Sequence, residues 1–135
     1  KNVISCLENG IHVLCEKPMG INYNETKAMI DSAMRNKRFL LEGIWTRYFP
    51  AVIQCKQWID DGIIGTPIHL QCDFGLARSG PQQSPTSWKN QLNGGAFMGL
   101  GCYVIDPIQR TFGNGRYPSK ISAVGNIDNK YGVDT

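Results

Sequence analysis

A lysine at the end of a short apolar run is the first candidate for chemistry. The run from Val13 to Cys15 is followed by Glu16, Lys17 and Pro18. A run this short, bounded by turn signals, is typical of a strand buried on both faces of a parallel sheet. Ligands of open α/β sheets bind outside the carboxyl ends of the strands, and Pro18 restricts the conformation of Lys17. A lysine held there can donate to a substrate hydroxyl or carbonyl, although Glu-Lys at a strand end is more often a solvated ion pair.

A cluster of aromatic residues around one arginine is the second candidate. Trp45, Tyr48 and Phe49 surround Arg47 just before Pro50. One interpretation is an ordinary hydrophobic joint between domains, with the arginine stacked on a ring. The other is a pocket for a planar or polyhydroxy substrate, with aromatic walls and a single cation.

The third candidate is Tyr103, at the end of a stretch rich in glycine. Gly94, Gly95, Gly99 and Gly101 precede it, and such small residues allow close backbone approach. Tyr103 is either a core aromatic with a hydrogen-bonded hydroxyl or a general acid and base. A neighbouring lysine ammonium would assist the second role, because it stabilises a phenolate.

The helices and strands that must position these residues can be predicted from hydrophobic periodicity and from the capping and turn residues that bound each element. In the first third of the chain we expect a helix over residues 2–9, a strand over 12–16, a helix capped by Asn22 and Glu25, and a strand over 39–41. Ala28, Met29, Ala33 and Met34 should form the inner face of that capped helix. Strand, helix and strand in this length make one parallel βαβ unit.

The remaining chain has a different character. We expect a helix from Pro50, a strand over 68–74, a long polar loop over 77–93, a helix over 96–112 and a strand over 121–127. The fold class is therefore α/β. A dinucleotide-binding part over residues 1–43 precedes an α+β domain over 44–135 with a mostly antiparallel sheet.

Composition excludes several classes of function. The 135 residues carry a scattered net charge of +3, which does not indicate nucleic-acid binding. No apolar run approaches the roughly 20 residues that a membrane span needs. The five cysteines have no Cys-x-x-Cys spacing, which favours a reducing, cytoplasmic location, and the two histidines predict no metal site. Because the chain opens in what looks like a helix, we expect a fragment of a longer protein.

Taken together, these motifs resemble the Gfo/Idh/MocA family of NAD(P)-dependent oxidoreductases. The resemblance rests on Glu16-Lys17-Pro18, on Trp45-Thr46-Arg47 and on the glycine stretch that leads to Tyr103. It is strongest to the dihydrodiol dehydrogenase branch, which includes NADP-dependent D-xylose dehydrogenases. The resemblance implies a Rossmann domain, of which residues 1–43 would be the C-terminal part.

The same resemblance implies roles for individual residues. Lys17 and Tyr103 would be catalytic and would handle the hydroxyl proton of a vicinal trans-diol or of D-xylose. The cofactor would be contacted by Glu16, Lys17, Pro18, Trp45 and Arg47. The substrate would be contacted by Trp45, Phe74, Gly99 and Tyr103. NADP is the implied cofactor, with NAD left open, and a homodimer of the full-length protein through an open sheet face is implied as well.

One departure from the family pattern keeps an alternative open. Gly99 stands where the family usually has an aspartate that is expected to contact substrate hydroxyls. Asp106 matches another recurrent position but does not obviously replace that carboxylate. The alternative to an enzyme is therefore a non-catalytic relative that binds a sugar or a nucleotide.

Overall fold

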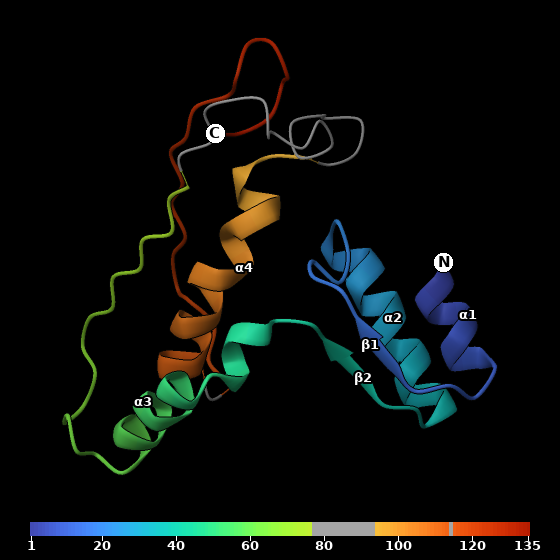
Figure 1. Ribbon diagram of the computed structural model, residues 1–135, viewed down its shortest axis with the longest axis horizontal. Coiled ribbons are helices and arrows are strands. Elements are labelled where there is room, and N and C mark those ends of the chain that lie inside the picture. The colour runs from blue at the N-terminus through green and yellow to red at the C-terminus, as the bar shows by residue number, and fades with distance from the viewer. Residues whose placement is uncertain (77–93, 114) are drawn as a thin grey trace. The chain divides into compact units, whose positions relative to one another are not determined.

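The computed structural model of this chain describes residues 1–76, 94–113 and 115–135. The chain divides into two compact units, Lys1–Ile44 and Trp45–Thr135 (Figure 1). The loop expected at 77–93 lies outside the described residues. No helix in the described ranges is long and apolar enough to cross a membrane.

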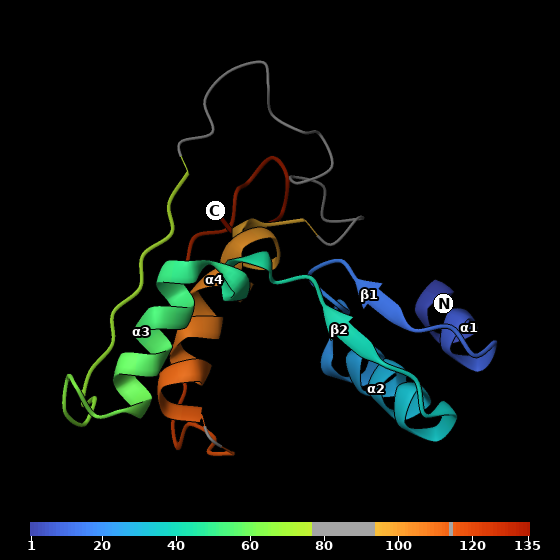
Figure 2. The same ribbon diagram turned by 60° about the horizontal axis from the view of Figure 1, so that its bottom comes forward.

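The first unit is a βαβ unit preceded by one helix. Its elements are α1 (Asn2–Glu8), β1 (Val13–Cys15), α2 (Tyr23–Asn36) and β2 (Leu40–Glu42). The two strands lie side by side and parallel, as Figure 2 shows, and their register places Val13 opposite Leu40 and Cys15 opposite Glu42. Helix α1 packs against α2. The parallel βαβ unit expected from the sequence is confirmed.

Helix α2 begins at the expected cap. The side chain of Asn22 accepts a hydrogen bond from the Glu25 backbone N–H at 3.0 Å. The Glu25 carboxylate in turn accepts the backbone N–H of Ile21 at 3.4 Å. The Glu25 N–H, which has no helical partner in the first turn, and the Ile21 N–H, just before the cap, are thus satisfied by the side chains that the sequence indicated.

Burial in the first unit differs from the expectation at several positions. Leu14 is 70% exposed, so the prediction of a strand buried on both faces is wrong for the described residues. Since those residues form only two strands, nothing among them covers the face on which Leu14 lies. The inner face of α2 consists of Met29, Ser32 and Ala33, while Met34 is 73% exposed. The expected face included Ala28 and Met34, because hydropathy alone does not place a small polar residue such as Ser32 at a helix contact.

The second unit is built on two helices. It begins with a single 3-10 turn, η1 (Trp45–Tyr48), which leads into α3 (Pro50–Asp60). Helix α4 (Ala96–Ile108) continues as a π-helical turn, η3 (Gln109–Gly113). Pro50 occupies the first turn of α3, as expected, where its missing N–H costs nothing. The helix expected over 96–112 changes character after Pro107, because proline cannot donate to the carbonyl four residues earlier.

The start of α4 is capped by a residue from the far end of the chain. The Asp134 carboxylate accepts the Phe97 N–H at 2.5 Å, and its backbone carbonyl accepts the Ala96 N–H at 3.0 Å. Gly95 has a positive φ of 122° and lies against this carboxylate, so a side chain there would collide with it. The cap and the glycine together fix where α4 begins.

The two strands expected in the second unit are not strands in the described residues. Residues 68–74 and 121–126 are extended without ladder partners, and one antiparallel bridge joins Ile127 to Asp134. Ile68 is 94% exposed and Val124 is fully exposed. Alternating hydropathy marks a face that could be buried, but a strand exists only where a neighbour pairs with its backbone. The expected mostly antiparallel sheet is therefore not confirmed.

Candidate active site

In the first unit, the loop that carries Lys17 lies at the carboxyl edge of the parallel pair. Glu42, at the end of β2, accepts the backbone N–H of Met19 at 2.9 Å. The N–H of Gly43 donates to the carbonyl of Cys15 at 2.7 Å. These bonds cross from one strand end to the other and fix the backbone on both sides of Lys17. Sequence reasoning missed Glu42, because its position follows from the register in which β1 and β2 pair and not from a local motif.

The thiol of Cys15 lies under the same loop. Burial raises its pKa, and the carboxylates of Glu42 and Glu16 raise it further. A thiol in such surroundings stays protonated and is a poor nucleophile at neutral pH. Among the described residues, no group of three or more metal-ligating side chains is found. The chemistry available at this edge is therefore that of Lys17 and its neighbouring carboxylate.

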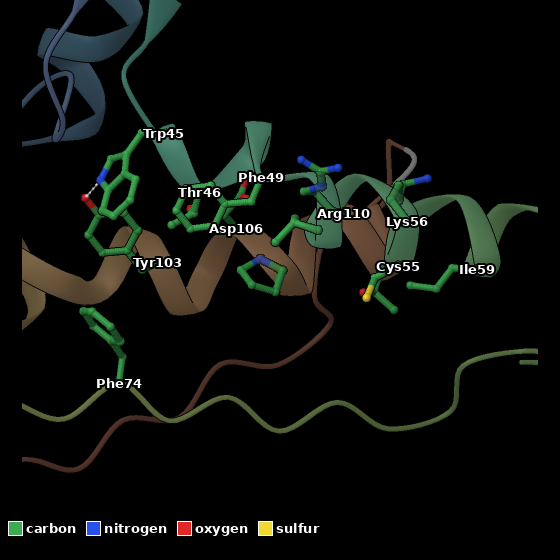
Figure 3. A pocket seen from close by; sticks show the side chains of 13 residues that line it. Trp45, Thr46, Phe49, Cys55, Lys56, Ile59, Phe74, Tyr103, Asp106 and Arg110 are labelled. Carbon is green, nitrogen blue, oxygen red and sulfur yellow. Dashed lines mark hydrogen bonds between the residues drawn. The ribbon is translucent and has the colours of Figure 1, made fainter.

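In the second unit, four aromatic rings meet, which come from η1, the N-cap of α3, α4 and the extended segment after α3. Trp45 and Phe49 contact edge to face at 5.0 Å between ring centroids. Trp45 and Tyr103 do the same at 6.1 Å, and Phe74 is tilted against Tyr103 at 5.5 Å. The indole N–H of Trp45 also donates to the Tyr103 hydroxyl oxygen at 2.6 Å (Figure 3). Trp45, Phe74 and Tyr103, which the resemblance placed at the substrate, are thus neighbours here.

A charged group lies next to these rings. Asp106 is only 4% exposed, and its carboxylate accepts the Arg47 guanidinium at 2.5 Å. Arg110 lies one turn further along and donates to the backbone carbonyl of Arg47 at 3.3 Å. Arg47 is therefore engaged by Asp106. The arginine that borders the adjoining cavity is Arg110, a residue that sequence reasoning missed because no local pattern distinguishes it.

A cavity of about 410 Å³ runs along these groups between α3 and α4. Its walls combine aromatic and aliphatic side chains with a carboxylate and two cations, as Figure 3 shows. The lining residues are Trp45, Thr46, Phe49, Val52, Cys55, Lys56, Ile59, Phe74, Tyr103, Asp106, Pro107, Arg110 and Thr111. The volume is typical of a small-molecule site with an apolar body and a few polar groups.

Gly99 lies one helical turn before Tyr103 on α4. A Cβ atom built on it meets no described atom within 4 Å, so the backbone leaves room for a side chain at this position. Gly99 is not among the residues that line the cavity. Its predicted contact with substrate stays a prediction, as do the roles of Glu16, Lys17 and Pro18, which belong to the first unit.

Both units match known protein families. Residues 1–44 match the oxidoreductase family with an NAD-binding Rossmann fold. Residues 52–135 match the GFO/IDH/MocA C-terminal domain. The prediction of an α/β fold that begins with part of a Rossmann domain is therefore confirmed.

Curated relatives carry one name in several vertebrates. A trans-1,2-dihydrobenzene-1,2-diol dehydrogenase of Mus musculus is 40% identical over 98% of this chain, which covers 38% of that protein. Those of Bos taurus and Danio rerio are 39% and 37% identical over 91% and 84% of the chain, which covers 36% and 33% of them. The chain thus spans between a third and two fifths of the length of these relatives.

A solved structure shares the fold. The crystal structure of an NAD binding oxidoreductase from Klebsiella pneumoniae aligns with a TM-score of 0.73 at 25% sequence identity. The alignment covers 82% of this chain and 30% of that one.

Proposed function

Because this chain belongs to the Gfo/Idh/MocA family of oxidoreductases, we propose that it is part of an NADP-dependent dehydrogenase. The substrate is a vicinal trans-diol of the trans-1,2-dihydrobenzene-1,2-diol type, or D-xylose. The names of the vertebrate relatives support the diol. The observation that carries the proposal is the aromatic site of the second unit, in which a phenol is held between Trp45 and Phe74.

The aromatic residues of the site suit a cyclic diol. Faces and edges of Trp45, Phe74 and Tyr103 border the cavity and can pack against an unsaturated ring. The Tyr103 hydroxyl is carried by one of these rings, so a substrate hydroxyl that lies against them can bond to it. Such a site orients the carbinol carbon by packing and its hydroxyl by one hydrogen bond, which is what positioning for catalysis requires.

In the proposed mechanism, Tyr103 accepts the proton of the substrate hydroxyl. Lys17 stabilises the phenolate form of that tyrosine and donates to the substrate oxygen. The Lys17 side chain is half-buried, and the bonds of Glu42 and Gly43 to the surrounding backbone fix the loop that carries it. A lysine restrained in this way loses little conformational entropy when it binds substrate.

The residues of the first unit fit a nicotinamide cofactor. Their parallel strands end at one edge, and ligands of open α/β sheets bind outside that edge. Glu16, Lys17 and Pro18 would border the cofactor there, and Trp45 and Arg47 would contact it from their own unit. The nicotinamide, when bound, supplies the hydride acceptor. Arg47 keeps further N–H donors beyond the one that bonds Asp106, so it can hold Asp106 and a ligand together.

Turnover by the full-length protein tests the proposal. We expect reduction of NADP with trans-1,2-dihydrobenzene-1,2-diol, and slower reduction of NAD. Tyr103→Phe and Lys17→Met should each lower kcat by about 10²- to 10⁴-fold, the usual contribution of a general acid or base. Tyr48→Phe is the matched control, because Tyr48 is a 57% exposed phenol that does not line the cavity. Full activity of Tyr103→Phe would refute the mechanism.

A specific observation keeps a second candidate function open. Gly99 cannot supply the carboxylate that the family pattern places at its position. A non-catalytic protein that binds a sugar or a nucleotide would retain the same fold and the same pocket. Cofactor binding without turnover of either substrate would favour this candidate over the enzyme.

Assembly and location complete the proposal. We expect the full-length protein to be a cytoplasmic homodimer that associates through an open sheet face. All five cysteines are free thiols, which is compatible with a reducing compartment. Sedimentation of the full-length protein measures its oligomeric state.

A further inference from the structure

The hydrogen bond between Trp45 and Tyr103 has a defined direction. An indole N–H can only donate, so the Tyr103 oxygen is the acceptor in this 2.6 Å bond. The hydrogen of the Tyr103 hydroxyl is therefore directed away from the indole. In Figure 3 the bond lies at the end of the cavity that Phe74 borders.

Further contacts hold the indole donor in place. Arg47, two residues after Trp45, pairs with buried Asp106, and Arg110 donates to the Arg47 carbonyl. Tyr103, Asp106 and Arg110 follow one another at helical spacing on one side of α4 and its extension. Trp45 is also packed against the ring of Phe49. The 3-10 turn is thus joined to α4 and its extension at three successive points, which fix the backbone that carries Trp45.

We infer that Trp45 is a positioning residue that acts through Tyr103, by donating a hydrogen bond that is stronger to the phenolate than to the phenol. The inference rests on the proposed function, in which the phenolate accepts the substrate proton. A hydrogen bond to an ionised acceptor is about twice as strong as a neutral one, so the donor favours the ionised form. This role differs from packing against substrate, because it depends on one N–H and not on the ring.

The charged side chains that line the cavity have described partners of their own. Asp106 on α4 is paired with Arg47 of the 3-10 turn, and Lys56 of α3 is paired with Asp60. Arg110 is bonded to a backbone carbonyl. Cys55 of α3 is the remaining titratable group among the lining residues that the structure describes. Trp45 donates directly to the Tyr103 oxygen.

The proton step that depends on this bond is balanced. The substrate O–H bond breaks, its proton forms the O–H bond of the Tyr103 phenol, and the carbinol carbon becomes a carbonyl carbon when it gives up a hydride, which a bound nicotinamide would accept. The Trp45 N–H remains bonded to the same oxygen before and after the transfer. It therefore stabilises the charged reactant form of Tyr103 more than the neutral product form.

Nuclear magnetic resonance of the full-length protein tests the bond without requiring turnover. In Tyr103→Phe, the indole N–H resonance of Trp45 should move upfield, while that of Trp58 stays in place. With tyrosine labelled at the ζ carbon, Trp45→Phe should shift the titration of Tyr103 to higher pH by about one unit. Trp58→Phe is the matched control, because Trp58 lies on α3 outside the cavity lining. Replacing Trp45 with 3-benzothienylalanine keeps the ring shape and removes only the N–H, so it separates the bond from packing.

Kinetics complete the test. In Trp45→Phe, the low-pH limb of kcat/KM for the diol should move to higher pH together with the titration. The loss of activity should be about tenfold greater below the limb than above it. An unchanged Tyr103 titration in both Trp45 variants overturns the inference, whether or not the protein is active. Absence of turnover by the wild-type protein, with the titration shift present, refutes the proposed function and leaves the bond intact.

Discussion

The pair of Arg47 and Asp106 should contribute far more to stability than an exposed ion pair. The carboxylate is 4% exposed and the arginine side chain is 30% exposed, with 2.5 Å between their bonded atoms. The test replaces Arg47 and Asp106 with alanine, first one at a time and then both together. Because burial differs between the partners, the two single substitutions should have unequal effects.

The magnitudes follow from what each substitution leaves behind. Arg47→Ala leaves a buried carboxylate without its cation, which should lower the free energy of unfolding by about 3–5 kcal/mol. Asp106→Ala leaves a guanidinium that can reach water, so we expect a loss of only about 1–2 kcal/mol. The double variant leaves no buried charge. The summed losses of the two single variants should therefore exceed the loss of the double variant by a coupling energy of about 2–3 kcal/mol.

Equilibrium urea unfolding of the full-length protein, followed by indole fluorescence, measures these differences. Lys27 and Asp31 provide the matched control, since they form an ion pair one helical turn apart on α2 with both side chains well exposed. Their double-mutant cycle should show no measurable coupling. High salt should not alter the Arg47–Asp106 coupling, because buried pairs are little screened.

Two results would refute this reasoning. One is a greater loss of stability in Asp106→Ala than in Arg47→Ala, since that ordering contradicts the difference in burial. The other is a coupling energy no larger than that of Lys27 and Asp31. Either result would mean that the carboxylate of Asp106 reaches solvent or a second cation in the folded protein.

Further substitutions test three local features. Gly99→Ala should raise the free energy of unfolding by about 0.5–1 kcal/mol, because a helical glycine is replaced where the structure leaves room; a loss measured by urea unfolding would contradict this. Asn22→Ala should lower it by about 1 kcal/mol in the same assay, and Asn24→Ala on the same helix should not. Folding raises the pKa of Cys15, so the contribution of this thiol to the free energy of unfolding is complete below pH 9.0 and is lost above it. From pH 8 to 10, the free energy of unfolding should therefore fall more for the wild type than for Cys15→Ala. At pH 8 a thiol reagent should label Cys15 more slowly than exposed Cys55, and Glu42→Gln should speed the labelling of Cys15.

Local signals in the sequence were enough to place the helices. Asn22 with Glu25, and Pro50 at the first position of α3, act over one helical turn, so the residues that set the boundary lie next to it in sequence. The extended segments 68–74 and 121–127 were misassigned as strands for the complementary reason. Their alternation is a local property, whereas strand formation depends on a partner whose position no local pattern gives.

The residue types of the site could be predicted from the sequence, but the ion pair that links its elements could not. Trp45, Phe74 and Tyr103 were singled out, and the structure brings their rings together. The ion pair of Arg47 with Asp106 was not foreseen. The sequence carries the charge of each partner, but only the docking of the 3-10 turn on α4 makes them a pair.

That docking gives the residues around Tyr103 two functions at once. The groups that fix the orientation of the Tyr103 hydroxyl also hold the turn from Trp45 to Tyr48 on α4. Asp106 need not touch a ligand to affect chemistry, because loss of its bond to Arg47 frees the turn that carries the Trp45 donor. Substitutions at Asp106 should therefore lower stability and move the Tyr103 titration together. A substitution at Phe74, whose described contact with Tyr103 is between the two rings, should change substrate packing and leave the Trp45 bond to Tyr103 in place. Comparing substitutions at Asp106 and Phe74 therefore distinguishes the contacts that hold the Tyr103 hydroxyl from the contacts that pack against the substrate.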